Sequence, residues 1–415
     1  MSIIVQKYGG TSVADADRIR AVADRIVRYR ENGHHVVVVV SAMGDTTDDL
    51  LMLAREISPV PEPRELDMLL TAGERIAMSL LAIAVNARGC RAASYTGSQA
   101  GIITDTRHGQ ARIVEIRPKR IKESLEAGNV VIVAGFQGLS TDYDITTLGR
   151  GGSDTTAVAM AAALGAEVCE IYTDVDGVFT ADPRVVRSAR RIDRISYEEM
   201  LELAAAGAKV LQSRSVEYAR RTGVRVHVRS SFTDEPGTWV VGEEQDVEVG
   251  MEAALISGVA LDDAEAKVTL EQVPDRPGVA AAIFKAVAAE AVNVDMIVQN
   301  VSHQGTTDLS FTIPREEVRR VEAILERIVK EIGAPRYTVD EQIAKVSLVG
   351  AGMKSHPGVA ADMFEALSEQ GINIEMISTS AIRISCVVRA DDAERAVRAI
   401  HTRFGLDGGA PRAEG

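Results

Sequence analysis

The segment from Thr146 to Ala157, TTLGRGGSDTTA, combines the residue types that hold a phosphoryl group. Its three glycines allow a sharp turn and bring backbone N–H groups close to an anion. The apolar sequence that follows predicts a helix whose positive N-terminal end faces the same turn. Arg150, Ser153 and Asp154 add charge and polar contacts. The segment therefore predicts an anion-binding loop at the start of a helix.

A second glycine turn lies near the N-terminus, in VQKYGGTSV at residues 5–13. Lys7 ends an expected strand there, and Gly9 and Gly10 follow it. A lysine at a strand end beside a glycine turn is a point charge that suits a phosphate. The order differs from the P-loop motif GxxxxGK[ST], in which the lysine follows the glycines. Alone, the segment also fits a solvated lysine beside a plain turn, but together with the first loop it favours phosphate binding.

An acidic segment, YTDVDGVFTADPR at residues 172–184, raises the question of calcium. It contains Asp174, Asp176 and Asp182, but no glutamate closes the loop at the EF-hand spacing. We therefore predict no calcium loop here, and no dedicated metal site.

The elements that must position these loops alternate between strand and helix up to about residue 245. The runs at 35–43 and 130–138 are nearly continuous in Val, Ile and Ala, which is typical of strands buried on both faces of a parallel sheet. Residues 14–33 and 64–89 have apolar residues at helical spacing and end on glycine. We predict an α/β fold with a mainly parallel sheet covered by helices, and ligands at the carboxyl ends of its strands.

The chain repeats itself beyond a predicted linker at 246–265. One copy begins at Ala266 (AKVTLEQVPDRPGVA) and the other at Ala344 (AKVSLVGAGMKSHPGVA). Each reads as strands, a Pro-Gly turn into a helix, and an Asn-containing turn, which predicts a small antiparallel sheet with helices on one face. This half resembles a tandem pair of ACT domains, which are small-molecule regulatory modules. The predicted domains are residues 1–245, 266–340 and 341–415.

Composition narrows the class of protein. A chain of 415 residues with 46% hydrophobic content predicts two or three domains. A net charge of −14 argues against nucleic acid or an anionic membrane as the main partner. The scattered cysteines, Cys90, Cys169 and Cys386, fit a reducing cytoplasm. With no basic leader and no long apolar run at the N-terminus, we expect a cytoplasmic protein without a membrane span.

Six segments, in matching order, resemble the aspartokinases of the monofunctional type with a C-terminal pair of ACT domains. The resemblance implies the amino-acid kinase fold and MgATP-dependent phosphorylation of the β-carboxylate of L-aspartate. The product would be 4-phospho-L-aspartate, in the first step toward lysine, threonine, methionine and isoleucine. The segments are VQKYGGTSV, SAMGDTTD at 41–48, LLTAGE at 69–74, GFQG at 135–138, TTLGRGGSDTTA and YTDVDGVFTADPR.

The residue types make physical sense of that reaction. A carboxylate nucleophile is already ionised at neutral pH, because its ordinary pKa is roughly 4, so it needs no general base. The obstacle is repulsion between an anionic acceptor and an anionic triphosphate, which cations relieve. This explains lysines and glycine loops in place of a Ser/His/Asp arrangement.

The resemblance also implies individual roles. Lys7 and Lys209 would stabilise the transferring phosphoryl group, and Asp154 would hold the lysines in place. Asp154 also fits an ordinary first-turn aspartate, and Lys209 a helix cap. Arg150 would bind the α-carboxylate of the substrate and Glu74 its amino group, although Glu74 also fits a helix N-terminus. Ser41, Thr47 and Ser153 would add hydroxyl contacts to the substrate.

ATP contacts are likewise implied by the resemblance, with Mg²⁺ held mainly by ATP oxygens and water. Phe179 fits a core position equally well. The implied ATP-binding residues are Lys7, Gly9, Gly10, Ser12, Gly151, Gly152, Thr173, Asp174, Phe179, Asp182, Arg184, Lys209 and Val210.

The ACT-like copies imply allosteric inhibition by lysine, threonine or both, and a homo-oligomer or an α2β2 assembly. Asp275 is a candidate contact for an effector amine, with a plain Pro-Gly turn as the alternative. Ala381 stands where related aspartokinases commonly carry glutamate, which weakens the expectation of lysine sensitivity. Met251 is a candidate internal start for a separate regulatory subunit. The implied effector residues are Asp275, Pro277, Gly278, Val279, Asn293, Gln299, Val359, Ala360, Asn373, Ile374, Ser380 and Ala381.

Two alternatives stay open on the sequence. One is another kinase of the same fold, acting on glutamate or acetylglutamate. The other is an amino-acid-binding regulator that has lost catalysis, although Lys7, Arg150, Asp154 and Lys209 argue against it.

Overall fold

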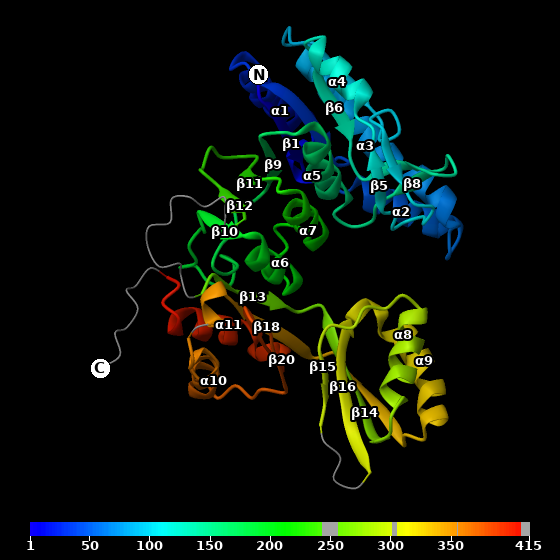
Figure 1. The fold of residues 1–415 in the computed structure, drawn as a ribbon, viewed down its shortest axis with the longest axis vertical. Coiled ribbons are helices and arrows are strands. Elements are labelled where there is room, and N and C mark those ends of the chain that lie inside the picture. Colours follow the sequence, from blue (N-terminus) through cyan, green and yellow to red (C-terminus); the bar gives the residue numbers. More distant parts are fainter. Residues whose placement is uncertain (243–255, 301–304, 355, 408–415) are drawn as a thin grey trace. The chain divides into compact units, whose positions relative to one another are not determined.

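The computed structural model describes residues 1–242, 256–300, 305–354 and 356–407. The chain forms two compact units (Figure 1). The candidate start Met251 lies outside the described residues. The first unit comprises Met1–Val178, Arg191–Ala204 and Lys209–Met251, and the second comprises Phe179–Arg190, Ala205–Ala208 and Glu252–Gly415.

A central sheet of eight strands organises the first unit. Neighbouring strands pair in parallel, apart from the antiparallel pair of β11 and β12. The predicted mainly parallel sheet is therefore confirmed. In spatial order the strands are β10 (Arg194–Ser196), β12 (Thr238–Val241), β11 (Val226–Ser230), β9 (Val168–Thr173), β1 (Ile3–Tyr8), β2 (His35–Val40), β6 (Val130–Ala134) and β3 (Ala92–Tyr95).

Helices cover both faces of this sheet. On one face α1 (Ala16–Glu31) and α3 (Pro63–Asn86) share a buried cluster with Tyr8 and the side chains of β2 and β6. Because side chains alternate along a strand, Lys7 points to the other face, where it meets Asp154 in the first turn of α5 (Gly152–Leu164). α7 (Ser213–Thr222) packs against α5. Burial on both faces explains why the run of five valines in β2 is uninterrupted.

A smaller sheet leads the chain into α5. Its strands, in the order β5-β4-β7-β8, are β5 (Ile113–Ile116), β4 (Ile102–Thr104), β7 (Gln137–Ser140) and β8 (Ile145–Thr147). β7 and β8 form an antiparallel pair, and the loop after β8 carries the predicted anion-binding glycines. The remaining helices of the first unit are the 3₁₀ turn η1 (Gly10–Val13), α2 (Thr46–Ile57), α4 (Lys119–Glu126) and α6 (Tyr197–Ala205).

By length and composition alone, α3 is apolar enough to cross a membrane. Its buried residues, however, include Ala77, Leu81 and Val85, which pack in the same cluster as α1 and the sheet. It also buries the carboxylates of Asp67 and Glu74. This pattern is that of a core helix in an α/β unit.

The second unit contains two antiparallel sheets of four strands, as the sequence repeat predicts. We name them regulatory sheet 1 and regulatory sheet 2, after the regulatory modules that the sequence repeat resembles. Sheet 1 consists of β15 (Ile297–Gln299), β16 (Thr306–Pro314), β14 (Glu265–Pro274) and β17 (Arg336–Asp340), with α8 (Val279–Ala289) and α9 (Val318–Ile332) side by side against it (Figure 1). Sheet 2 consists of β13 (Gly258–Asp262), β18 (Ile343–Val349), β20 (Arg383–Arg389) and β19 (Met376–Thr379), with α10 (Val359–Glu369) and α11 (Ala393–Arg403).

Two parts of the predicted domain division are wrong. Residues 258–262, placed in the linker, form β13, which pairs with β18 in regulatory sheet 2. The acidic side chains around this segment obscured a strand whose partner lies more than eighty residues away along the chain. Phe179–Arg190, placed in the first domain, belongs to the second unit, because Ala181 and Val186 are buried with β18, α10 and α11.

Ion pairs join the two regulatory copies reciprocally. Lys345 in β18 lies with its Nζ 2.5 Å from Glu265 Oε1 and 2.5 Å from Asp295 Oδ2, and its side chain is 1% exposed. Its repeat equivalent Lys267 in β14 pairs with Glu375, and Glu375 is the equivalent of Asp295. Each copy therefore offers a lysine to the acid of the other. Burial lowers the pKa of Lys345, but the neighbouring carboxylates more than offset this and hold that pKa above its ordinary value.

Replacing this lysine tests the reciprocal pairing. We expect Lys345→Ala to reduce the stability of the regulatory unit by about 3 kcal/mol, because it leaves the buried carboxylate of Glu265 without its counter-charge. Thermal and denaturant unfolding of the full chain measures the change. Lys285→Ala removes an exposed lysine from α8 and should leave the transition in place. Equal transitions for the two variants would contradict the pairing.

Candidate active site

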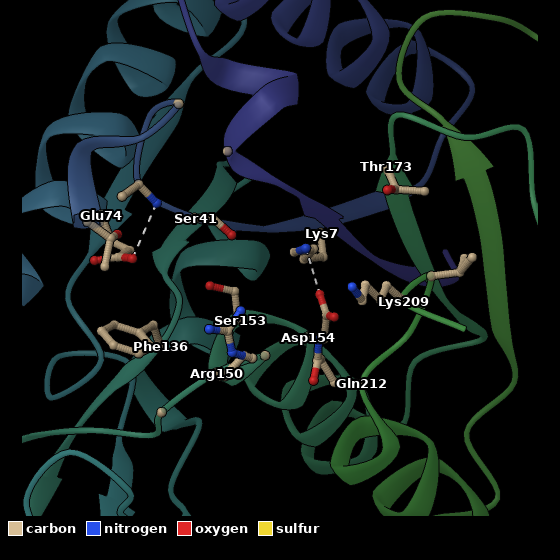
Figure 2. Close-up of a pocket in the computed structure, with 18 residues that line it drawn as sticks. Lys7, Ser41, Glu74, Phe136, Arg150, Ser153, Asp154, Thr173, Lys209 and Gln212 are labelled. Carbon is tan, nitrogen blue, oxygen red and sulfur yellow. Dashed lines mark hydrogen bonds and ion pairs between the residues drawn. The ribbon is translucent and has the colours of Figure 1, made fainter. Parts of the chain in front are cut away.

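A cleft of about 370 Å³ opens in the first unit at the carboxyl ends of β1, β2 and β9 (Figure 2). Both predicted glycine loops contribute to it. Its lining consists of Lys7, Gly10, Ser41, Ala42, Gly44, Thr47, Glu74, Phe136, Gly149, Arg150, Gly151, Gly152, Ser153, Asp154, Thr173, Lys209, Val210 and Gln212. The cleft therefore brings together thirteen of the residues predicted as catalytic, substrate-binding or ATP-binding.

The ion pair of Lys7 and Asp154 lies at the centre of the cleft (Figure 2). Lys7 Nζ is 2.6 Å from Asp154 Oδ1, and only 12% and 9% of the two side chains are exposed. A side chain at Gly9 would place its Cβ 3.5 Å from Lys7 Nζ, so the ammonium sits directly over the first glycine loop. Asp154 is both a first-turn aspartate and the partner of the lysine, so the two roles considered from the sequence coexist.

Close backbone contact explains why glycines stand at two positions. A Cβ at Gly10 would lie 2.9 Å from the carbonyl oxygens of both Ala42 and Gly44. Gly151 has a left-handed φ of 71°, and a Cβ there would fall 2.1 Å from Gln212 Cγ. The two loops can therefore approach their neighbours only without side chains.

Glu74 is a buried carboxylate with spare hydrogen-bonding capacity. The residue is 3% exposed, and its Oε1 accepts a hydrogen bond of 3.2 Å from Ala42 N–H. Among the described residues its buried Oε2 has no hydrogen-bond partner. Burial raises the pKa of Glu74 from 4.5 to about 7. Glu74 lies in the interior of α3, so the alternative of a helix N-terminus is wrong.

Two cations in the cleft are free to meet a ligand. In the described part of the chain, Lys209 and Arg150 have neither a hydrogen bond nor an ion pair from their side chains. Lys209 lies in the turn between α6 and α7, so it does not decorate a helix. Glu74 and Lys209 lie at opposite ends of the cleft, with Ser153, Arg150 and the Lys7–Asp154 pair between them (Figure 2). The cleft is thus acidic at one end and basic from its centre to the other.

Sequence reasoning missed several residues of the lining. Phe136 is the most unusual, because a non-glycine residue there has a left-handed φ of 67°. Its backbone is held by Thr156 Oγ1, which accepts from Phe136 N at 3.2 Å, and by Leu148 N, which donates to Phe136 O at 2.8 Å. The GFQG motif was its only signal. The other missed residues are Ala42, Gly44, Gly149 and Gln212, of which Gln212 had no motif.

Six predicted ATP-binding residues are not part of the cleft lining. Gly9 and Ser12 lie in the first glycine loop, where Ser12 Oγ is 2.5 Å from Ser231 Oγ. Asp174 follows Thr173, and its Oδ1 accepts a hydrogen bond of 3.1 Å from the Thr173 hydroxyl. Phe179 is half-buried, and Asp182 pairs with Arg184 at 2.7 Å; these three residues belong to the second unit. Their assignment to ATP stays a prediction.

The predicted effector residues occupy matching places in the two regulatory sheets. In the first copy Asp275, Pro277, Gly278 and Val279 lead from β14 into α8, and Asn293 and Gln299 flank or end β15. In the second copy Val359 and Ala360 begin α10, Asn373 and Ile374 precede β19, and Ser380 and Ala381 form the turn after it. β15 and β19 are the edge strands of their sheets, so the predicted effector residues that flank or end these two strands lie at a sheet edge.

The described residues contain no cluster of three or more His, Cys, Asp or Glu side chains able to hold a metal ion.

Comparison with known proteins adds to this geometry. Residues 2–230 match the amino acid kinase family, and residues 268–333 and 346–404 each match an ACT domain. The chain is 58% identical to the aspartokinase of Mycolicibacterium smegmatis and 59% identical to that of Mycobacterium tuberculosis, in each case over 98% of this chain and 97% of the relative.

Solved structures of aspartokinases are also similar to this chain. The crystal structure of E. coli aspartokinase III in complex with aspartate and ADP has a TM-score of 0.81 at 28% identity, and covers 97% of this chain and 99% of that chain. The aspartate kinase from Synechocystis has a TM-score of 0.54 at 46% identity, over 99% of this chain and 70% of that chain. The predicted fold class, an amino-acid kinase fold followed by two ACT domains, is confirmed.

The raised pKa of Glu74 predicts how stability changes with pH. Between pH 4.5 and about 7 the folded protein holds a proton that the unfolded chain has lost, so wild-type stability falls as pH rises through this window. Glu74→Gln lacks this titration. Its gain over the wild type should grow across the window, reach about 3 kcal/mol, and stay constant above it.

Denaturant unfolding at pH 5, 6, 7 and 8 measures that gain. Glu56→Gln, at an exposed position of α2, is the control and should show no such trend. A gain for Glu74→Gln that does not vary with pH would show that Glu74 titrates at its ordinary value.

Proposed function

Because the chain belongs to the aspartokinase family and is an aspartate kinase, we propose that it transfers the γ-phosphoryl group of ATP to the β-carboxylate of L-aspartate, giving 4-phospho-L-aspartate. The observation that carries this proposal is the order of charges along the cleft. Among the described residues, Glu74 lies at one end with one oxygen that has no partner, and Arg150 lies near the middle with an unpartnered guanidinium. Lys7 lies at the centre and Lys209 at the other end. This order matches an amino acid placed with its side-chain carboxylate toward a phosphate.

The acceptor end is suited to the backbone groups of an amino acid. Oε2 of Glu74 can accept a hydrogen bond from the substrate ammonium, which also supplies the charge that favours ionised Glu74. Arg150 can bind the α-carboxylate through two parallel hydrogen bonds. Ser41, Thr47 and Ser153 offer hydroxyl groups to the remaining oxygens. Recognition of both α-groups leaves the β-carboxylate to point along the cleft.

The phosphate end supplies positive charge without a base. Lys7 lies at the centre, and Asp154 fixes the ammonium at the glycine loop. Lys209 adds a second positive charge. These charges offset the repulsion between the acceptor carboxylate and the triphosphate, and they stabilise the charge on the transferring group. Mg²⁺ would arrive with ATP, held by phosphate oxygens and water.

The ATP assignment draws support from the glycine loops. Gly10 and Gly151 let the two loops pack closely against their neighbours in the cleft, and α5 begins directly after Gly151 with its N-terminus at the cleft. The E. coli aspartokinase III structure described above is a complex with aspartate and ADP. We assign Thr173, Val210 and the glycines of both loops to the nucleotide, together with Gly9, Ser12, Asp174, Phe179, Asp182 and Arg184 from the family resemblance.

The regulatory copies would couple effector binding to catalysis, provided the effector binds two states of the enzyme unequally. A second E. coli aspartokinase III structure is a complex with lysine and aspartate in a T-state. We propose lysine, threonine or both as inhibitors of this chain, acting at the helix starts and edge strands of the two sheets. The open edges of β15 and β19 suit assembly of the enzyme through its ACT domains. We place the enzyme in the cytoplasm, at the first step toward lysine, threonine, methionine and isoleucine.

Substrate choice and the central lysine can be tested together. ADP formation should depend on aspartate, and glutamate and acetylglutamate should not replace it. Lys7→Ala should lower kcat roughly a thousandfold, because it removes a cation aimed at the transferring phosphoryl group. Lys119→Ala, an exposed change on α4, is the control with normal turnover. Activity with another acceptor alone, or near-normal turnover of Lys7→Ala, would refute the proposal.

Effector identity is tested at Ala381, in the exposed turn after β19. Calorimetric titration of lysine and threonine, separately and together, identifies which of them binds. Ala381→Glu should lower the lysine concentration for half-inhibition roughly tenfold, since it adds a carboxylate for the effector ammonium. Ala381→Gln has nearly the same shape without the charge. An inhibition curve shared by all three proteins would remove Ala381 from the account.

A further inference from the structure

Arg150 stands on a loop whose side chains do not hold it in place. Its guanidinium is exposed and has no partner in the described chain, and the loop residues Gly149, Gly151 and Gly152 have no side chains. The direction in which the guanidinium points must therefore come from contacts of the backbone. Those contacts converge on Asp67 of α3, a residue outside the cleft lining.

Asp67 is a buried carboxylate that is 1% exposed, and both of its oxygens have hydrogen-bond partners. Its Oδ1 accepts hydrogen bonds from the Thr147 hydroxyl and from Gly109 N–H, the latter at 3.0 Å. Its Oδ2 lies 3.1 Å from Gly109 N and 2.7 Å from His108 Nδ1. A carboxylate this deeply buried is costly unless every partner is kept. Asp67 therefore fixes Thr147 and the 108–109 segment relative to α3.

Both of these partners border the Arg150 loop. Thr147 is the last residue of β8, and Arg150 follows three positions later. The carbonyl oxygen of Gly109 lies 3.0 Å from the point where a Cβ of Gly149 would stand. Ala111 N donates to Thr147 O at 2.9 Å, which ties the two segments together a second time. The backbone before Arg150 is thus clamped between Asp67 and its partner segment.

Arg214 of α7 completes this support from the other side. Its guanidinium donates to Leu148 O at 2.7 Å and to Ala111 O at 2.7 Å. The loop that carries Arg150 is therefore anchored to two helices, α3 and α7, on either side. α3 also carries Glu74, seven residues after Asp67 and two helical turns along the same helix.

We infer that Asp67 is a positioning residue for substrate recognition, which aligns Arg150 with Glu74 by binding Thr147 and the 108–109 segment. The inference rests on the proposed role of Arg150 at the α-carboxylate. Arg150 and Glu74, which would bind the amino acid, both depend on α3 for their positions. Loss of the Asp67 hydrogen bonds should therefore weaken binding of aspartate and leave ATP binding largely intact. Among the proposed nucleotide contacts, Gly151 and Gly152 share the loop with Arg150. The contacts in the first glycine loop and at Thr173, Lys209 and Val210 make no hydrogen bond with Asp67.

The test uses the full chain and steady-state kinetics with ADP formation as the readout. Thr147→Val removes the hydroxyl that Asp67 binds while keeping the side-chain shape. We expect it to raise the KM for aspartate roughly tenfold, with the KM for ATP and kcat changed by less than about threefold. Thr147→Ser keeps the hydroxyl and should restore the wild-type KM. Asp67→Asn should resemble Thr147→Val or exceed it.

Controls separate this inference from the proposed function. Thr104→Val removes a nearby buried hydrogen bond, that of the Thr104 and Thr146 hydroxyls, and should leave both KM values unchanged. Arg150→Ala tests the proposed substrate contact itself. If Arg150→Ala leaves the KM for aspartate unchanged, the substrate assignment fails. The positioning role of Asp67 is wrong if Arg150→Ala raises the KM for aspartate but Thr147→Val does not. It is also wrong if Thr147→Val raises the KM for ATP as much as the KM for aspartate.

Discussion

The ion pair between Lys7 and Asp154 is the constraint on which the first unit depends. It joins the end of β1 to the first turn of α5, so it fixes a strand, a helix start and two glycine loops at once. Strand pairing positions the neighbouring loop residues, because Lys7 lies in register with Val39 of β2 and Ile171 of β9. Ser41 and Thr173 therefore emerge beside the lysine at the same edge of the sheet. The ammonium is largely buried, is held by one carboxylate and has glycine backbone beside it, which suits the binding of a further anion.

Local sequence patterns predicted much of the fold and of the cleft. Lys7, Arg150 and Asp154 stand in short motifs whose glycines and flanking apolar runs indicate a strand end or a helix start, and the cleft unites them. What escaped prediction depends on residues distant in sequence. Gln212 lines the cleft only because α7 returns to Gly151, and the unpaired oxygen of Glu74 is a consequence of burial. The strand β13 was missed because β18, its partner, comes from the second copy of the repeat.

The regulatory half shows how a duplicated sequence is built into one unit. Lys267 and Lys345 are equivalent positions, as are Asp295 and Glu375, and each lysine meets the acid of the other copy. This is the arrangement of a symmetric dimer interface, in which each side presents the same groups to the other. Here both sides belong to one chain. These reciprocal ion pairs also disfavour an incorrect packing of the two copies, because a lysine without its acid would be buried as an unpaired charge.

The path of the chain through Phe179–Arg190 has a consequence for modularity. The chain leaves the first unit after Val178, contributes Ala181 and Val186 to the core of the second unit, and returns at Arg191. β13 is in turn a strand of regulatory sheet 2 placed before the whole of sheet 1. No single cut along the chain therefore separates the two units. A gene segment ending near residue 245 would carry Phe179–Arg190 and Ala205–Ala208 of the second unit without their partners.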